Sequence, residues 1–139
     1  MYKLVKEPRA WWPVVWNGVA EDGAIVENKI ELRFVLHSED EFARLAVDGV
    51  KLGQRAGDEL AAAADADAGP EAPLSTLYAG FVRKIAVDWR GVGAENGEPL
   101  KFDEPGALEQ LLNVPGVFKA AVEAYGRCRA GEKDVRRGN

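Results

Sequence analysis

Residues 30–42 read IELRFVLHSEDEF, and this stretch decides how the first half of the chain folds. In its first half, apolar side chains alternate with charged ones, and this period of two predicts a half-buried β-strand. The SEDE run that follows matches a capping box, in which Ser38 and Glu41 bond each other's backbone amides at the start of a helix. We therefore expect a strand followed by a capped helix, which the pair Asp48-Gly49 ends.

A partner strand is predicted before this one. Residues 12–16, WPVVW, are rich in β-branched and aromatic side chains. The run 21–23, EDG, predicts a tight turn between the two strands, because glycine allows a positive φ angle. Pro13 has no amide hydrogen, so we expect its strand at a sheet edge or at a bulge. Residues 1–5 are expected to add a short third strand.

An acidic, alanine-rich segment separates the two halves of the chain. Residues 56–73 contain five acidic side chains, no basic one and a single leucine, so the segment has little to bury. Alanine favours helix in its middle, and the glycine and prolines that follow stop it. We predict a solvated linker or a weak helix.

The second half is predicted to be helical. Over 74–89, apolar side chains recur at spacings of three and four, which is typical of an amphipathic helix. The run 91–99, GVGAENGEP, ends this pattern, and its Asn-Gly pair favours a turn. We expect a short helix capped by Asp103 and a last helix with an apolar face over 117–125.

Together these patterns predict a single α+β domain over residues 1–139. It consists of an N-terminal antiparallel β-hairpin or small sheet with a capped helix, followed by a C-terminal helical part. The expected boundaries are a hairpin plus helix in 1–55, a linker or weak helix in 56–73, a helical part in 74–128 and a mobile tail in 129–139.

Composition excludes several classes of protein. The chain has 139 residues, a formal net charge of −5, one cysteine and one histidine, so neither an intrachain disulfide nor a histidine-rich metal site is expected. No run is apolar enough to span a membrane, and the charged start lacks the apolar stretch of a signal peptide. We expect a cytoplasmic protein that binds no cofactor, no nucleic acid and no membrane.

No residue pattern predicts an active site. His37 is expected to be a strand-end residue, because it is a lone histidine with no cysteine-, histidine- or serine-containing motif around it that would make it a base or a ligand. Cys128 lies between Arg127 and Arg129, whose charges would lower the thiol pKa, but without a base it is expected to be incidental. The Gly91-x-Gly93 pair follows a predicted helix rather than a strand, so we interpret it as a turn. An enzyme is not expected.

Two sets of residues are assigned roles in binding and in structure. Trp11 and Trp12 are adjacent and cannot share one face of a strand, so one of them is expected at the surface, and the pair is predicted to contribute to a partner-binding surface. The buried Trp89 is expected to pack the following loop against the last helices. The structural motif is predicted to comprise Trp89, Gly91, Asn96, Gly97 and Pro99.

The order of motifs in the second half resembles a known family. Residues 85–102, IAVDWRGVGAENGEPLKF, are followed by the runs LEQLL, VPGV and AVEAY over 108–125. This order resembles the tail assembly chaperones of tailed bacteriophages and prophages, and the strand and SEDEF helix start within 24–55 are similar to the front of that family. The tryptophan-rich start and the insert 56–73 depart from it.

The resemblance implies a protein without catalytic function in the cytoplasm of the bacterial host cell. Members of that family bind the tape measure protein, keep it soluble and help to recruit tail tube subunits. A homo-oligomeric state stays open. The alternative is a structural virion protein at the head–tail joint or at the tail terminus, a class that tends to form rings.

Overall fold

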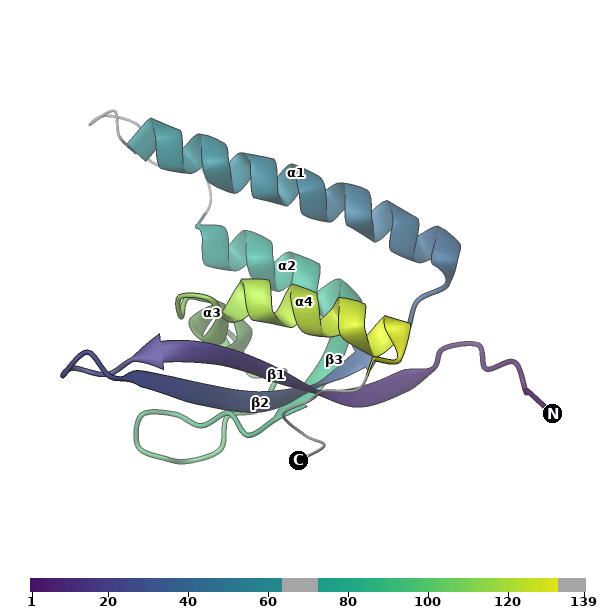
Figure 1. The fold of residues 1–139 in the computed structure, drawn as a ribbon, viewed down its shortest axis with the longest axis horizontal. Coiled ribbons are helices and arrows are strands. Elements are labelled where there is room, and N and C mark those ends of the chain that lie inside the picture. Colours follow the sequence, from purple (N-terminus) through teal and green to yellow (C-terminus); the bar gives the residue numbers. More distant parts are fainter. Residues whose placement is uncertain (64–72, 133–139) are drawn as a thin grey trace.

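The computed structural model describes residues 1–63 and 73–132, and its fold is α+β. An antiparallel sheet in the order β1-β2-β3 curves beneath the helices (Figure 1). The strands are β1 (Arg9–Val19), β2 (Ile25–Val35) and β3 (Ala86–Arg90), and the helices are α1 (Glu39–Ala63), α2 (Leu74–Ile85), α3 (Ala107–Leu112) and α4 (Val117–Ala130).

The hairpin of β1 and β2 confirms the strands predicted from the sequence. Val14 pairs with Ile30 on the inner face, and Pro13 pairs with Glu31 on the outer face. Because β1 is an edge strand, Pro13 needs no amide partner on its open side. The predicted turn is also present, with Gly23 at a φ of 88°.

The third strand is not the predicted one. Residues 1–5, expected to form it, pair with no strand. The third strand is β3 instead, which begins at Ala86 directly after α2 ends at Ile85. The predicted helix over 74–89 is therefore wrong in its last turn. Trp89 pairs with Leu32 of β2, and this pairing buries its side chain in the sheet. The helical part predicted over 74–128 therefore contains a strand.

α1 is much longer than the sequence predicted. The helix passes through Asp48-Gly49, the pair expected to end it, and continues to Ala63. The absence of a side chain at Gly49 has a packing reason: a Cβ atom there would lie 3.4 Å from the Phe81 ring of α2. The first part of the predicted linker 56–73 thus belongs to α1, and its residues 64–72 lie outside the described part of the chain.

The short helix of the second half begins later than predicted. Asp103 does not cap it; turns occupy residues 102–106, and α3 begins after Gly106, which has a φ of 80°. The last helix is confirmed as α4, which ends at Ala130 and is capped by Gly131 at a φ of 68°. Because α4 extends to Ala130, the mobile tail predicted over 129–139 is wrong at its first two residues, and its residues 133–139 lie outside the described part.

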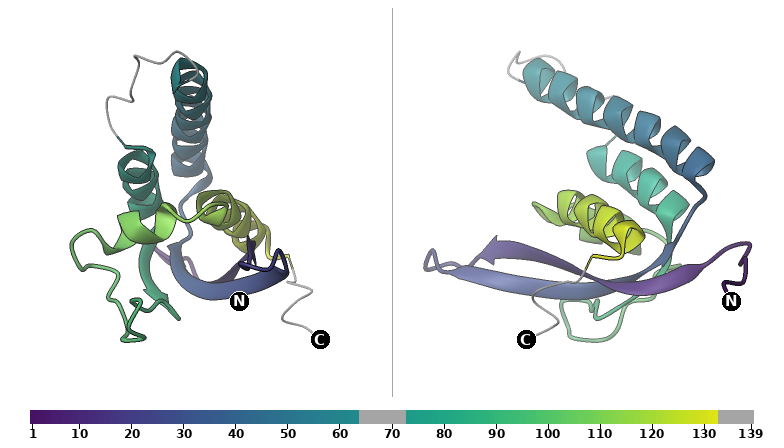
Figure 2. Two further views of the ribbon diagram at one scale, coloured as in Figure 1. Left: turned by 90° about the vertical axis from the view of Figure 1, so that its left-hand side faces the viewer. Right: turned by 45° about the vertical axis from the view of Figure 1, so that its right-hand side comes forward.

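The core lies between the concave face of the sheet and α2, α3 and α4 (Figure 2). Its fully buried side chains come from every layer: Val14, Leu32 and Phe34 of the hairpin, Val82 and Ile85 of α2, Leu108 of α3 and Val117 of α4. α1 packs against α2 and reaches this core through Leu45 and Phe42. Within residues 1–63 and 73–132, no helix is both long and apolar enough to cross a membrane.

Candidate partner-binding surface

The predicted binding pair, Trp11 and Trp12, is divided between the two faces of β1. Trp12 lies on the inner face opposite Leu32 and packs against the core. Trp11 lies on the outer face, half-buried, with the Arg90 guanidinium 4.1 Å from the centroid of its ring. Their joint role in binding stays a prediction, and only Trp11 faces outward from the sheet.

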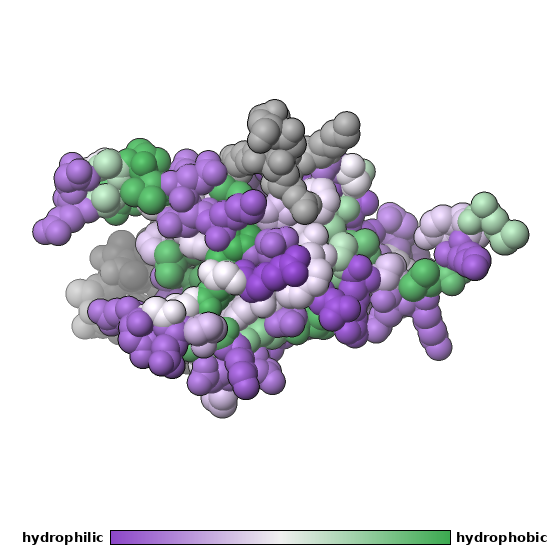
Figure 3. Space-filling model, turned by 90° about the horizontal axis from the view of Figure 1, so that it is seen from below, coloured by the Kyte–Doolittle hydropathy of each residue, from purple (hydrophilic) through white to green (hydrophobic). Residues whose placement is uncertain are grey.

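The outer face of the sheet is chemically mixed. Arg90 is held there by Glu31, with Nε 3.1 Å from one carboxylate oxygen. Seen from below, hydrophilic residues are interspersed with apolar ones across this face (Figure 3). Charged pairs interrupt its apolar area, so it offers no continuous surface of the kind that marks a strong interface.

The loop after β3 repeats the hairpin turn almost residue for residue. In the run AEDGA of 20–24 and the run AENGE of 94–98, the glycine amide donates to the first alanine carbonyl at 2.8 Å. The carboxylate of Asp22 and the amide oxygen of Asn96 each accept from the backbone amide two residues on, at 2.9 and 3.0 Å. Gly97 has a φ of 87°, like Gly23, which explains glycine at both places.

Trp89 fixes this loop to the body. Its indole Nε1 donates to the Leu100 carbonyl at 2.8 Å, and its ring meets Phe102 edge to face with centroids 5.3 Å apart. Gly93 and Pro99 form a bridge across the base of the loop. Gly91 has a φ of 88° directly after the strand, a conformation that suits glycine. The five motif residues therefore belong to one turn and its anchor.

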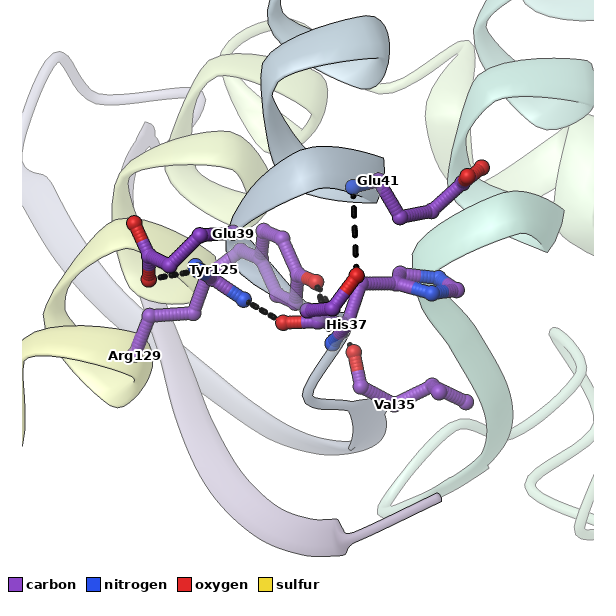
Figure 4. A network of polar contacts seen from close by, with 7 residues as sticks. Val35, His37, Glu39, Glu41, Tyr125 and Arg129 are labelled. Atoms are coloured by element: carbon purple, nitrogen blue, oxygen red, sulfur yellow. Dashed lines mark hydrogen bonds and ion pairs between the residues drawn. The ribbon is translucent and has the colours of Figure 1, made fainter. Parts of the chain in front are cut away.

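A polar network sets the direction in which α1 leaves the sheet (Figure 4). The Tyr125 hydroxyl donates to the Val35 carbonyl at 2.8 Å, and burial raises the pKa of this phenol. The Arg129 guanidinium donates to the His37 carbonyl and pairs with the Glu39 carboxylate at 2.7 Å. The end of α4 thus holds both the end of β2 and the first turn of α1.

The first turn of α1 is also fixed from within and from α2. The Ser38 hydroxyl accepts from the Glu41 amide at 3.2 Å, which confirms that half of the predicted capping box. The His37 Nε2 lies 2.5 Å from the Lys84 carbonyl oxygen, and the Lys84 ammonium pairs with Asp48 at 3.4 Å. His37 therefore lies at the end of the strand, where the sequence placed it, and holds α2.

Away from the face that contacts α2, α1 carries exposed apolar residues that the sequence patterns did not predict. We call Ala43, Ala46, Val47 and Val50 the α1 stripe. All four are exposed, with Val47 at 53% and Val50 at 62%, and the last three line a shallow surface hollow of about 430 Å³ with Lys51 and Gln54. Their spacing of three and four residues was a usable signal, but the predicted helix ended at Asp48-Gly49.

Two observations on the described residues concern metal binding and thiol chemistry. No group of three or more histidine, cysteine or acidic residues within 1–63 and 73–132 is arranged to hold a metal ion. Cys128 is buried, and burial raises the pKa of its thiol despite the opposing charge of Arg129, so the lowered pKa expected from its neighbours is wrong.

Comparison with known proteins adds no family to this description. No protein-family model matches the chain, and no match is found among curated proteins or solved structures.

Proposed function

We propose that this chain is a tail assembly chaperone of a tailed bacteriophage or prophage, acting in the host cytoplasm without catalysing a reaction. In this role it binds the tape measure protein and helps to recruit tail tube subunits. The observation that carries the proposal is the α1 stripe, a row of apolar side chains exposed on the outermost helix of the fold (Figure 1). The order of motifs over 85–125 supplies the family.

The stripe has the chemistry that a helical client needs. A tape measure chain of the expected kind presents rows of apolar side chains along helices, and an apolar helix face can cover such a row. Completing the burial of Val47 and Val50 contributes roughly 1–3 kcal/mol, so useful affinity requires contacts over several turns. The α1 stripe supplies about two such turns, from Ala43 to Val50. The net charge of −5 favours solubility of the complex.

Co-expression with the tape measure product tests this proposal. The wild-type chain should keep that product soluble and co-purify with it, whereas Val47→Glu with Val50→Glu should lose both effects because the stripe becomes charged. Val122→Glu is the matched control, since Val122 is an exposed valine on α4 rather than α1. A wild-type chain that neither solubilises nor co-purifies with the product would show that the chaperone proposal is wrong.

A second candidate function, a structural virion protein at the head–tail joint or tail terminus, is favoured by the hairpin tip. β1 and β2 extend past the helices, and Val19, Ile25 and Val26 are exposed at their end (Figure 1). Rings form when one surface of a subunit binds a different surface of its neighbour, and an exposed apolar tip can be one of these two surfaces. A stable ring-sized species in light scattering, lost in Ile25→Glu but kept in Val47→Glu, would favour this candidate over the chaperone.

A further inference from the structure

The α1 stripe faces away from every other described element. On the inner side of α1, Leu45 is buried and Gly49 lies against Phe81 of α2. The stripe lies on another side of the helix, where its four side chains are exposed and the hollow beside them is lined by α1 residues alone. An apolar row of this kind lowers solubility unless another surface covers it.

Charge is distributed unevenly along the same helix. Its first turn contains Glu39, Asp40 and Glu41, and Lys51 lies beyond the far end of the stripe. Glu39 pairs with Arg129, and Glu41 pairs with Arg44. Asp40, the third acid of this turn, is exposed and forms no ion pair with another described residue. In two copies of α1 that run in opposite directions, this acidic first turn and Lys51, near the middle of the helix, carry opposite charges that can face each other.

We propose that two copies of this chain pair through α1, antiparallel, about a two-fold axis that passes between Ala46 and Val47. This axis places Ala43 of one copy opposite Val50 of the other, and Ala46 opposite Val47, so that each valine meets an alanine. Small residues opposite larger ones allow two helices to approach closely. Lys51 then lies about two residues, or roughly 3 Å along the axis, from the level of Asp40 in the other copy.

The interface is self-limiting and small. A two-fold contact uses the same patch on both copies, so it closes at a dimer and does not propagate. The α1 stripe spans about two helical turns, which is well below the roughly 800 Å² per partner of a standard stable interface. The dimer is therefore weak and forms in proportion to concentration.

Weak pairing gives the stripe a regulated function, and this step rests on the function proposed above. In the free chaperone each copy covers the α1 stripe of the other, which protects it from non-specific contacts. A tape measure helix with a longer apolar row competes for the same surface and separates the copies. The client therefore binds to a monomer, and a higher chaperone concentration weakens its apparent affinity.

Sedimentation measures the dimer without any client. The wild-type mass should rise from monomer to dimer with concentration, and it should stay monomeric in Val47→Glu with Val50→Glu, while Val122→Glu dimerises like the wild type. Lys51→Glu should raise the dissociation constant about three- to tenfold, and adding Asp40→Lys should restore it. Circular dichroism confirms that each variant keeps its helices. A wild-type mass that stays monomeric at all concentrations would overturn the proposal.

Cysteine cross-linking measures the register. In a Cys128→Ala background, Val47→Cys lies next to the two-fold axis and should form a disulfide between copies. Gln54→Cys should not, because antiparallel pairing separates the two copies of this position by roughly 20 Å. Equal cross-linking at both positions would indicate parallel pairing and overturn the proposal.

The two proposals fail separately. A monomeric chain that binds the tape measure product overturns the dimer and leaves the chaperone function standing. The other outcome is a dimer that cross-links in the expected register but does not dissociate when the tape measure product is added. This outcome overturns the regulation and the chaperone function, but it leaves the self-association in place.

Discussion

The guanidinium of Arg129, in the last turn of α4, lies 4.1 Å from the centroid of the Phe42 ring in the first turn of α1. The same guanidinium bonds the His37 carbonyl and the Glu39 carboxylate. One side chain near the end of the described chain therefore joins β2, α1 and α4. The direction of α1, and with it the presentation of the α1 stripe, depends on this contact.

Arg129→Ala is expected to lower the free energy of unfolding by about 1–3 kcal/mol, because it removes a cation–π contact and charged hydrogen bonds together. The control is Arg127→Ala, an exposed residue of the same helix, which should stay within about 0.5 kcal/mol of the wild type. Urea denaturation of both variants measures the difference. Equal stabilities would show that the network in Figure 4 contributes nothing to the fold.

Substitution of Trp89 tests the anchor of the 91–99 loop. Trp89→Ala should cost about 3–5 kcal/mol, because a side chain only 5% exposed leaves a cavity in the core. Trp89→Phe keeps most of the ring but leaves the Leu100 carbonyl without its donor, so it should cost about 1–3 kcal/mol. The melting temperatures of both variants are measured by thermal unfolding. They are compared with that of Trp11→Ala, which removes a half-buried tryptophan. An unchanged melting temperature in Trp89→Ala would contradict the anchoring role.

Local sequence patterns predicted the hairpin, but they could not locate β3. Ile85 and Trp89 are spaced by four residues, as on a helix, yet Trp89 lies in a strand. Trp89 adopts a strand conformation because it pairs with Leu32 of β2. The free edge of β2 exists only once the hairpin has formed, so the periodicity of residues 74–89 cannot indicate it. Pairing with this edge overrides the helical spacing.

The α1 stripe was missed for a related reason. Asp48-Gly49 has the composition of a helix end, but the missing side chain at Gly49 serves the contact with Phe81. The purpose of that glycine is visible only when α2 is placed beside α1. The network around Arg129 likewise joins residues 90 and 92 positions apart in the sequence, and no local signal connects them.

Glycine substitutions in α1 distinguish the observed helix from the shorter one expected from the sequence. Gly53→Ala should raise the free energy of unfolding by up to about 1 kcal/mol, because alanine favours helix and its Cβ would meet nothing within 4 Å. Gly49→Ala should gain less, since its Cβ would lie 3.4 Å from the Phe81 ring. Urea denaturation ranks the two. A destabilising Gly53→Ala would show that α1 does not continue there.

Lowering the pH should remove the stability that the ion pair between α2 and α3 contributes. Arg83 donates to the Glu109 carboxylate at 2.8 Å, and this hydrogen bond lowers the pKa of Glu109 below its usual value of 4.5. A carboxyl with a lowered folded-state pKa contributes stability above its unfolded pKa, and this contribution is lost as the pH falls through the folded pKa.

The stability advantage of the wild type over Glu109→Gln should therefore be full at neutral pH and decline as the pH falls below 4.5. Denaturation of both proteins across this range measures it. Glu123→Gln, at an exposed position on α4, is the control and should run parallel to the wild type. If the free energy of unfolding of Glu109→Gln changed with pH in the same way as that of the wild type, the ion pair would be contradicted.

The thiol of Cys128 should be slow to react in the folded protein. The side chain is 7% exposed on the buried face of α4, and burial raises its pKa, so both access and thiolate fraction are low. A colorimetric disulfide reagent should label it much more slowly in buffer than in guanidinium, where the chain is unfolded and the thiol is exposed. Arg129→Ala should speed native labelling, because loosening the end of α4 exposes the preceding residue, even though loss of a nearby positive charge by itself disfavours the thiolate. Fast labelling of the native wild type would place Cys128 at the surface and contradict the packing of α4 against β1.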